Sequence, residues 1–238
     1  MVDEVLSDTK RTTSKCVRVD KNHKVTFLHS VLLAWVSEHG RDFPWRHSTN
    51  PYNVYVAEVL LRQTQADRVV VPYLDLVAAY PNVEAMASAN VDELRQWFKP
   101  LGLVTRADNL VRAATLILRD YNGVVPNDLD ALLALPGVGA YSARAILCLS
   151  FDQRVPMIDE SSGRLLRRIF GLLSRRPAYS DKELLKIASN LLPEKSHREF
   201  NLGLLDLAAQ FCHAREPNCG PCPLFQLCDF GSVKVNDS

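Results

Sequence analysis

The stretch Leu135-Pro-Gly-Val-Gly-Ala-Tyr-Ser142 decides how the central part of this chain folds. It follows a short helix that we expect over about 129–134, and it opens a second helix expected over about 141–149. The two glycines permit a tight turn and let the backbone approach a ligand with no Cβ in the way. Such a turn leaves free N–H groups at a helix N-terminus, which form a ready binding site for a phosphate group. Taken alone, Pro-Gly-Val-Gly is equally consistent with an ordinary pair of packed helices.

The rest of the chain has the apolar spacing of α-helices. Apolar residues recur at helical intervals over 25–35 and again over 110–118. Glycines stand where helices are expected to end, at Gly40, Gly102 and Gly123. No stretch alternates with the period of two that is typical of a strand. We therefore expect an all-α protein of about a dozen helices.

The composition is that of a globular protein, with 238 residues of which 47% are hydrophobic and 23% are charged. No apolar run reaches the roughly 18 residues needed to span a bilayer. Residues 1–21 are polar and lack the apolar segment of a signal peptide, so we expect a disordered tail and an intracellular protein with reduced thiols. The net charge of +1 does not identify a partner, because a nucleic-acid binder can balance a basic face with acids elsewhere.

Four of the six cysteines lie close together in a C-x6-C-x2-C-x5-C array, formed by Cys212, Cys219, Cys222 and Cys228. In a reducing cell such an array predicts a metal site rather than a pair of disulfides. Zinc accepts four thiolates, but zinc ribbons usually present two separate C-x2-C pairs and this chain has one. Four thiolates in one compact loop suit a [4Fe–4S] cluster. We expect the metal to supply the folding energy of this loop, and a role in electron transfer stays open.

Together these features resemble the helix–hairpin–helix DNA glycosylase superfamily of endonuclease III. The resemblance runs from about Val25 to Cys228 and rests on the hairpin, on Met157-Ile-Asp159 and on the four-cysteine loop. Three further motifs are similar to the branch that holds the A/G-mismatch adenine glycosylases and the T/G-mismatch thymine glycosylases: Arg41-Asp-Phe-Pro-Trp-Arg46, Ala57-Glu-Val-Leu-Leu-Arg-Gln-Thr-Gln65 and Phe200-Asn-Leu-Gly-Leu-Leu-Asp206.

The resemblance implies two lobes with the active site in the cleft between them. A six-helix barrel lobe that carries the hairpin is expected over 48–149. A [4Fe–4S] cluster lobe is expected over 22–47 plus 150–231. The resemblance also implies that the hairpin grips the DNA backbone without reading bases. Its expected DNA-binding residues are Pro136, Gly137, Val138 and Gly139.

Two carboxylates match catalytic positions of the family. Asp159 matches the catalytic aspartate, whose charge stabilises the positive charge that develops on the sugar. Its alternative role is the N-cap of a helix expected over 161–172, and the two roles are compatible. Glu58 matches the general acid of the adenine branch, a role that needs a pKa raised by burial. The alternative is a solvated glutamate, although its apolar neighbours leave little solvent face.

Tyr141 stands where the bifunctional lyases of the superfamily have a lysine that forms a Schiff base. A phenol cannot form that imine, so the resemblance implies a monofunctional enzyme that leaves an intact abasic site. Its alternative role is that of a core aromatic. Gln63 matches the wedge that fills the gap left by a flipped base, and Thr64 is a candidate contact with the partner base. Ordinary polarity of a helix surface is the alternative for both.

Four positions near Asp159 leave the family pattern or have open roles. Ser161 stands where the family usually has asparagine or histidine, and its hydrogen bonds have a shorter reach. Arg164, Arg167 and Arg168 are either phosphate contacts or a solvated helix face.

Some motifs are closer to the thymine branch of the family and others are shared with the adenine branch, so they differ in the target base that they favour. The chain ends ten residues after Cys228, without the Nudix-like domain usual in the adenine branch, and it reads Gly-Leu-Val over 102–104 where that branch usually has Gly-Tyr-Tyr. Residues 43–47 and 198–203 are closer to the thymine branch, whereas Gln63-Thr-Gln65 is shared with the adenine branch. We expect excision of thymine or uracil opposite guanine in double-stranded DNA, by a cytoplasmic, nucleoid-associated monomer. The alternatives are an adenine glycosylase acting opposite guanine or 8-oxoguanine, a non-catalytic DNA-binding module and a redox protein.

Overall fold

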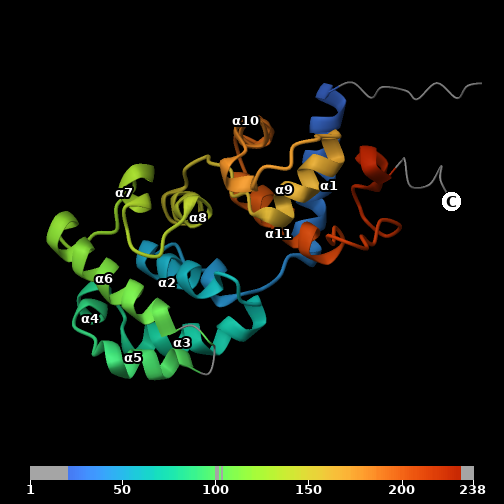
Figure 1. The fold of residues 1–238 in the computed structure, drawn as a ribbon. Helices are drawn as coiled ribbons and strands as arrows, with labels where there is room; N and C mark the ends of the chain where they lie inside the picture. The colour runs from blue at the N-terminus through green and yellow to red at the C-terminus, as the bar shows by residue number, and fades with distance from the viewer. Residues whose placement is uncertain (1–20, 100–101, 103, 232–238) are drawn as a thin grey trace, which may run out of the picture.

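The computed structural model describes residues 21–99, 102 and 104–231, and these residues form α-helices and short 3-10 turns without a strand (Figure 1). The all-α prediction is confirmed. Of the predicted tail, residues 1–20 lie outside the described residues, while Lys21 begins α1 and does not belong to a tail. The helices are α1 (Lys21–His39), α2 (Pro51–Leu61), α3 (Val70–Ala79), α4 (Val83–Ala87), α5 (Val91–Phe98), α6 (Val104–Tyr121), α7 (Leu129–Leu133), α8 (Ala140–Phe151), α9 (Glu160–Phe170), α10 (Lys182–Leu191) and α11 (His197–Gln210).

Two of the three glycines expected at helix ends, Gly40 and Gly123, lie within two residues of one, whereas α5 ends at Phe98, four residues before Gly102. Gly40 follows α1 directly, and the left-handed glycines Gly102 and Gly123 flank α6 with φ of +68° and +79°. At N-termini, the side chains of Asn50 and Asp128 accept N–H groups of α2 and α7, respectively. These caps satisfy backbone donors that a helix leaves unpaired in its first turn. None of the helices in the described ranges is long and apolar enough to cross a membrane.

The buried apolar side chains form two separate clusters. The larger cluster lies among α2 to α8 and includes Tyr55 and Ile146. The other lies among α1, α9, α10 and α11 and includes Leu166 and Phe200. In Figure 1 these two groups of helices stand side by side, and the chain passes between them after α1 and again after α8. The predicted lobe boundaries, the six-helix barrel and the iron–sulfur lobe stay predictions.

The second passage between the clusters positions the catalytic candidate. Residues 152–159 have no helical structure, and Met157 packs in the first cluster while Ile158 packs in the second. The segment is held from α11 by the buried side chain of Asn201, which accepts the Met157 N–H at 2.9 Å and donates to the Val155 carbonyl at 3.0 Å. Asp159 therefore lies at the boundary between the two groups of helices.

Candidate active site and DNA-binding hairpin

The predicted hairpin joins α7 and α8 through a turn that requires glycine at one position. Gly137 has φ of +84°, and a Cβ there would lie 3.1 Å from Cβ of Asn109. The turn is closed by the Val138 N–H, which donates to the Leu135 carbonyl at 3.1 Å. Arg62 donates to the Gly137 carbonyl at 2.9 Å and ties the turn to the end of α2. The backbone conformation therefore explains why glycine stands at 137.

The second glycine of the hairpin keeps the N-terminus of α8 open. Gly139 is the N-cap residue, so no side chain accepts the N–H groups of the first turn. A Cβ built at Gly139 would meet nothing within 4 Å, so the space in front of it is open. A helix N-terminus with open space and unpaired N–H groups can bind a phosphate. DNA binding by this hairpin itself stays a prediction.

Glu58 lies in the interior and not on a solvated face. It belongs to α2, where residues 54–60 are all buried, and its own exposed fraction is 6%. Burial raises the pKa of Glu58 to about 8, a hydrogen bond from Ser142 of α8 opposes the rise, and the Asp159 carboxylate adds to it. At neutral pH the side chain therefore carries a proton that it can donate. The alternative of a solvated glutamate is wrong.

Asp159 is the N-cap residue of α9, as the alternative interpretation of its role predicted. Its Oδ1 accepts the Ser162 N–H and the Ser162 hydroxyl, both at 2.7 Å. The Asp159 N–H donates to Ser162 Oγ at 3.0 Å, which completes a capping box. The cap fixes the carboxylate at the boundary between the helix groups, so it is compatible with a catalytic role. Catalysis by Asp159 stays a prediction.

Tyr141 lies beside both carboxylates. Burial raises its pKa well above 10, and the charges of Glu58 and Asp159 raise it further, while Arg46 and Arg41 oppose this rise. These electrostatic effects bring together residues from α2, from α8 and from the start of α9. The three candidates predicted from distant parts of the sequence therefore belong to one site, in which Tyr141 is the phenol next to two carboxyl groups.

The neighbours of Asp159 are engaged within the protein. Ser162, not Ser161, contacts the Asp159 carboxylate. The side chain of Glu160 accepts the Ala178 N–H at 2.8 Å, so its carboxylate has a backbone partner of its own. The hydrogen bonds that hold Asp159 in place therefore do not depend on the position at which the chain departs from the family pattern.

The three arginines of α9 bind other parts of the protein, so the alternative of a solvated helix face is wrong, while contact with phosphate stays a prediction. Arg164 donates to the Cys212 carbonyl at 2.8 Å, and Arg167 pairs with Asp181 at 2.9 Å. Arg168 donates to Cys212 Sγ at 3.2 Å and to the His213 carbonyl at 2.7 Å. Since Asp159 begins the same helix, α9 connects the acidic site with the loop that carries the cysteines.

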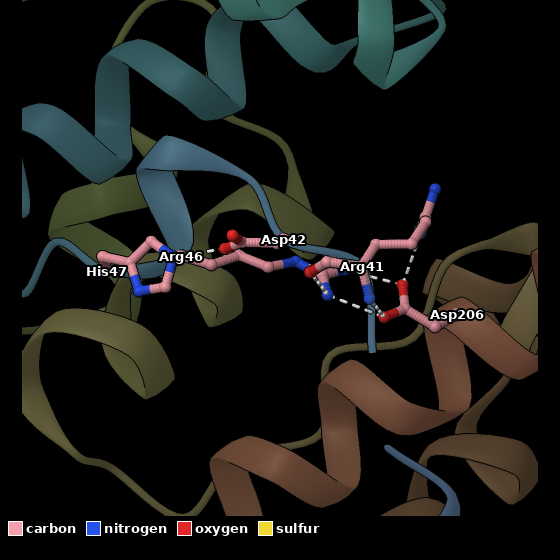
Figure 2. A network of polar contacts seen from close by, with 5 residues as sticks. All are labelled: Arg41, Asp42, Arg46, His47 and Asp206. Atoms are coloured by element: carbon pink, nitrogen blue, oxygen red, sulfur yellow. Dashed lines mark hydrogen bonds and ion pairs between the residues drawn. The ribbon is translucent and has the colours of Figure 1, made fainter. Parts of the chain in front are cut away.

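Two arginines and a buried aspartate form a charged group. They belong to the motifs at 41–46 and 200–206, but the sequence predicted no role for them. Figure 2 shows Arg41 and Arg46 converging on Asp206 of α11. Asp206 is 2% exposed, and its two oxygens accept the Arg41 Nε at 2.6 Å and both Arg46 Nη groups at 2.7 Å. Burial alone would raise the pKa of Asp206, but the two guanidinium groups hold it below its ordinary value. Two cations on one carboxylate leave positive charge beside Tyr141.

Aromatic contacts extend this group. Phe43 lies 5.3 Å from the Arg41 guanidinium and 5.5 Å from that of Arg46, and its ring stacks on Trp45. Outside the Asp206 contacts, His47 pairs with Asp42 (Figure 2). The sequence signal that could have identified the group is the pair of arginines in 41–46 together with an aspartate on an otherwise apolar helix, because a buried acid requires cationic partners.

Gln63 and Thr64 lie in a loop and not on a helix, so the alternative of helix-surface polarity is wrong. The helix α2 ends at Leu61, and Gln63 is exposed with φ of +54°. Thr64 is half-buried, and its hydroxyl accepts a hydrogen bond from Arg106 at 3.2 Å. Their predicted contacts with DNA stay predictions.

The four clustered cysteines line a single cavity together with apolar side chains such as Leu165 and Phe211. None of the four is joined to another cysteine by a disulfide bond. The pKa of Cys222 is raised to about 11, mainly by burial and also by the other three thiols. Among the described residues, no group of three or more His, Cys, Asp or Glu side chains is arranged to hold a metal ion. The donor set of four sulfurs in an apolar cavity fits an iron–sulfur cluster by type, and the cluster stays a prediction.

An all-helical protein with an open glycine hairpin, next to a buried carboxyl, a phenol and a capping aspartate, has the architecture of a helix–hairpin–helix DNA repair protein. The chain belongs to the HhH-GPD superfamily of base excision DNA repair proteins, because the model of that family matches residues 56–192. The predicted membership of the superfamily is confirmed.

Similar proteins are DNA glycosylases. A thymine/uracil-DNA glycosylase of Methanothermobacter thermautotrophicus is 36% identical over 212 residues, which are 89% of this chain and 95% of that protein. An adenine DNA glycosylase of Mycobacterium tuberculosis is 40% identical over 196 residues, which are 81% of this chain and 64% of that protein. Among solved structures, a thermostable thymine-DNA glycosylase matches with a TM-score of 0.84 at 35% identity, covering 89% of this chain and 98% of the other.

Proposed function

We propose that this protein is a monofunctional glycosylase of base excision repair that removes thymine or uracil opposite guanine in mismatched double-stranded DNA. The observation that carries the proposal is the buried Glu58, protonated at neutral pH and adjacent to Asp159 and Tyr141. The 36% identity to a thymine/uracil-DNA glycosylase that this chain covers almost completely supports the choice of base.

In this proposal the two carboxyl groups have complementary tasks. Glu58 donates its proton to the departing base while the bond between the base nitrogen and C1′ of the sugar breaks. Asp159 stabilises the positive charge that develops on the sugar ring, an effect that increases as water is excluded. A water molecule then forms a bond to C1′, and the proton that it releases returns to the Glu58 carboxylate, which restores the enzyme. The products are a free base and an abasic site.

Tyr141 limits the reaction to hydrolysis. Cleavage of the strand by a lyase starts from an amine that forms an imine with C1′, and a phenol cannot supply it. With a pKa well above 10, Tyr141 keeps its proton and can donate a hydrogen bond in the site. The abasic site therefore leaves the enzyme with its backbone intact.

The remaining predicted parts have tasks in this proposal. The hairpin at 136–139 holds the DNA backbone, Gln63 occupies the gap left by the flipped base, and Thr64 contacts the partner base. Cys212, Cys219, Cys222 and Cys228 hold a [4Fe–4S] cluster, which supplies folding energy to their loop when bound. The enzyme has a six-helix barrel lobe and a cluster lobe, and it acts as a cytoplasmic, nucleoid-associated monomer.

Adenine opposite guanine or 8-oxoguanine is the second candidate substrate. It is favoured by the 40% identity to an adenine DNA glycosylase and by Glu58, which matches the general acid of that branch. The proton on Glu58 serves a departing purine as well as a pyrimidine, so the buried carboxyl does not itself distinguish the two bases.

A panel of duplexes with single mismatches tests the proposal. Each end-labelled duplex is incubated with excess protein and divided into untreated, alkali-treated and borohydride-treated samples. We expect alkali-dependent breaks at T or U opposite G, and no covalent adduct with borohydride. Breaks only at A would transfer the assignment to the second candidate. Breaks without alkali, or a trapped adduct, would contradict the monofunctional mechanism.

A further inference from the structure

The loop that follows α2 has an unusual backbone conformation. Gln63 is exposed and has φ of +54°, in the left-handed region that residues other than glycine rarely adopt. Such a conformation is unfavourable for a residue with a Cβ, so it persists only where the surroundings impose it. Within the loop itself, the Thr64 N–H donates to the Leu61 carbonyl at 3.2 Å and the Thr64 hydroxyl donates to the Arg62 carbonyl at 3.3 Å. Both bonds join residues of the loop to each other, so they do not tie the loop to another helix.

The side chain of Arg106, in the first turn of α6, forms hydrogen bonds with the loop that follows α2. Its guanidinium donates to the Leu60 carbonyl, to the Arg62 carbonyl and, at 3.2 Å, to the Thr64 hydroxyl. These three acceptors lie on both sides of Gln63 along the chain. A rigid guanidinium fork that binds all three fixes the spacing of the loop, which a single flexible donor cannot do.

The charge of Arg106 is not neutralised by the groups that it contacts. Its three acceptors are neutral, and the side chain is only 9% exposed. The last carbonyls of α2 carry the partial negative charge of a helix C-terminus, which would repel a DNA phosphate. A buried cation beneath these carbonyls offsets that charge where the loop would meet DNA.

We propose that Arg106 is a positioning residue for base flipping, which holds Gln63 and Thr64 in the conformation that enters the duplex. The inference rests on the proposed function, because it acts through the wedge residue Gln63. Arg106 does not touch the reacting base in this account. Its effect is confined to the step in which a paired base leaves the helix and the gap is filled.

The test combines substitution of Arg106 with a reporter of flipping. Arg106→Met removes the fork and the charge, Arg106→Lys keeps the charge without the fork, and Arg119→Met is the control because Arg119 is an exposed arginine on the same helix, paired with Asp120. A 2-aminopurine next to the mismatch reports flipping, and single-turnover base release reports excision. On double-stranded DNA, we expect the rate of base flipping and the rate of base release each to fall about tenfold in Arg106→Met and less in Arg106→Lys. Arg119→Met is expected to match the wild type.

Two comparisons separate positioning from general loss of structure. On single-stranded DNA, whose target base is already unpaired, Arg106→Met and the wild type are expected to release base at equal rates. In a Gln63→Ala background, the change at Arg106 is expected to add less than about twofold, because both residues act in one step. Equal losses on single and double strands, or independent losses in the double variant, would overturn the proposal. If Arg106→Met does not fold, Arg106→Lys carries the same comparisons.

Failure of the proposed function is distinguishable from failure of this inference. If the wild type releases no base from any duplex of the mismatch panel, the proposed function fails. The flipping reporter then tests Arg106 without base release. If both Arg106 variants flip the base at the rate of the wild type, the proposed role of Arg106 is contradicted, even where the wild type excises its base normally.

Discussion

At the scale of single residues, Glu58 couples activity to stability. In the folded protein its pKa is about 8, whereas the ordinary value is 4.5. Between these two values the folded state holds a proton that the unfolded state has released. Stability therefore falls as pH rises through this window, by about 5 kcal/mol at most. The folded protein is most favoured by this group below pH 4.5, where both states are protonated.

Glu58→Gln is expected to remove this pH dependence and to abolish excision. The amide is neutral at every pH and keeps the shape of the side chain, but its N–H protons are not acidic enough to be transferred to the base. The variant therefore gains stability over the wild type as pH rises toward 8, and the wild type itself loses excision above about pH 8. Urea unfolding at pH 5 and pH 8, with single-turnover rates, measures both effects. An equal stability difference at the two pH values would contradict the raised pKa.

Asp159→Asn is expected to lose excision by about 10²–10³-fold or more while keeping DNA affinity. The amide oxygen can accept the two Ser162 hydrogen bonds, so the cap of α9 is preserved and only the negative charge is removed. Single-turnover base release and gel-shift titration at one salt concentration measure the two properties. Asp128→Asn, the same change at the cap of α7, is the control and is expected to excise normally. Wild-type excision by Asp159→Asn would make Asp159 a helix cap only.

At the scale of elements, the two glycines of the hairpin between α7 and α8 have different roles, one in the fold of the turn and one in the proposed binding of DNA. Gly137 has a left-handed backbone and no room beside Asn109, whereas Gly139 has an ordinary backbone and faces open space. The first glycine is therefore required by the turn itself. The second leaves space in front of α8, where a phosphate would approach.

Substituting each glycine by alanine is expected to give opposite results. Gly137→Ala should destabilise the protein by about 1–3 kcal/mol, because its φ disfavours alanine and its Cβ crowds Asn109. Gly139→Ala should cost less than about 1 kcal/mol yet weaken DNA binding about tenfold, because the new methyl group occupies the phosphate space. Urea unfolding and fluorescence anisotropy with a labelled duplex measure the two effects. Unchanged DNA affinity in Gly139→Ala would contradict phosphate binding at this helix end.

At the scale of the whole molecule, α9 connects the acidic site to the cysteine loop. The helix begins at the Asp159 cap, and its side chains Arg164 and Arg168 bind the backbone and thiol of Cys212. An unfolded cysteine loop would leave these arginines without their acceptors. Disorder at the loop is therefore expected to reach the end of the helix that holds Asp159.

Cys222→Ser is expected to yield poorly folded protein without bound iron, because the loop depends on metal binding for its folding energy. The wild type, purified anaerobically, should be yellow-brown and contain about four iron atoms and about four acid-labile sulfides per chain. Cys148→Ala is the control, because Cys148 is buried in the other core cluster, and it should keep its iron. Iron and zinc analyses decide between the metals. Stoichiometric zinc without iron would contradict the iron–sulfur assignment.

The sequence by itself determined the features that depend on short-range spacing. The helical period, the glycine that the turn requires at 137, the cap residue at 159 and the cysteine array are all local patterns that neighbouring residues impose. Only the tertiary structure decided which side chains meet. Glu58, Tyr141 and Asp159 come from three elements, and the pKa of Glu58 depends on burial that no local pattern encodes. Asp206 and Arg106 acquired their roles from partners about 40 to 165 positions away along the chain, because such contacts arise only when distant helices pack together.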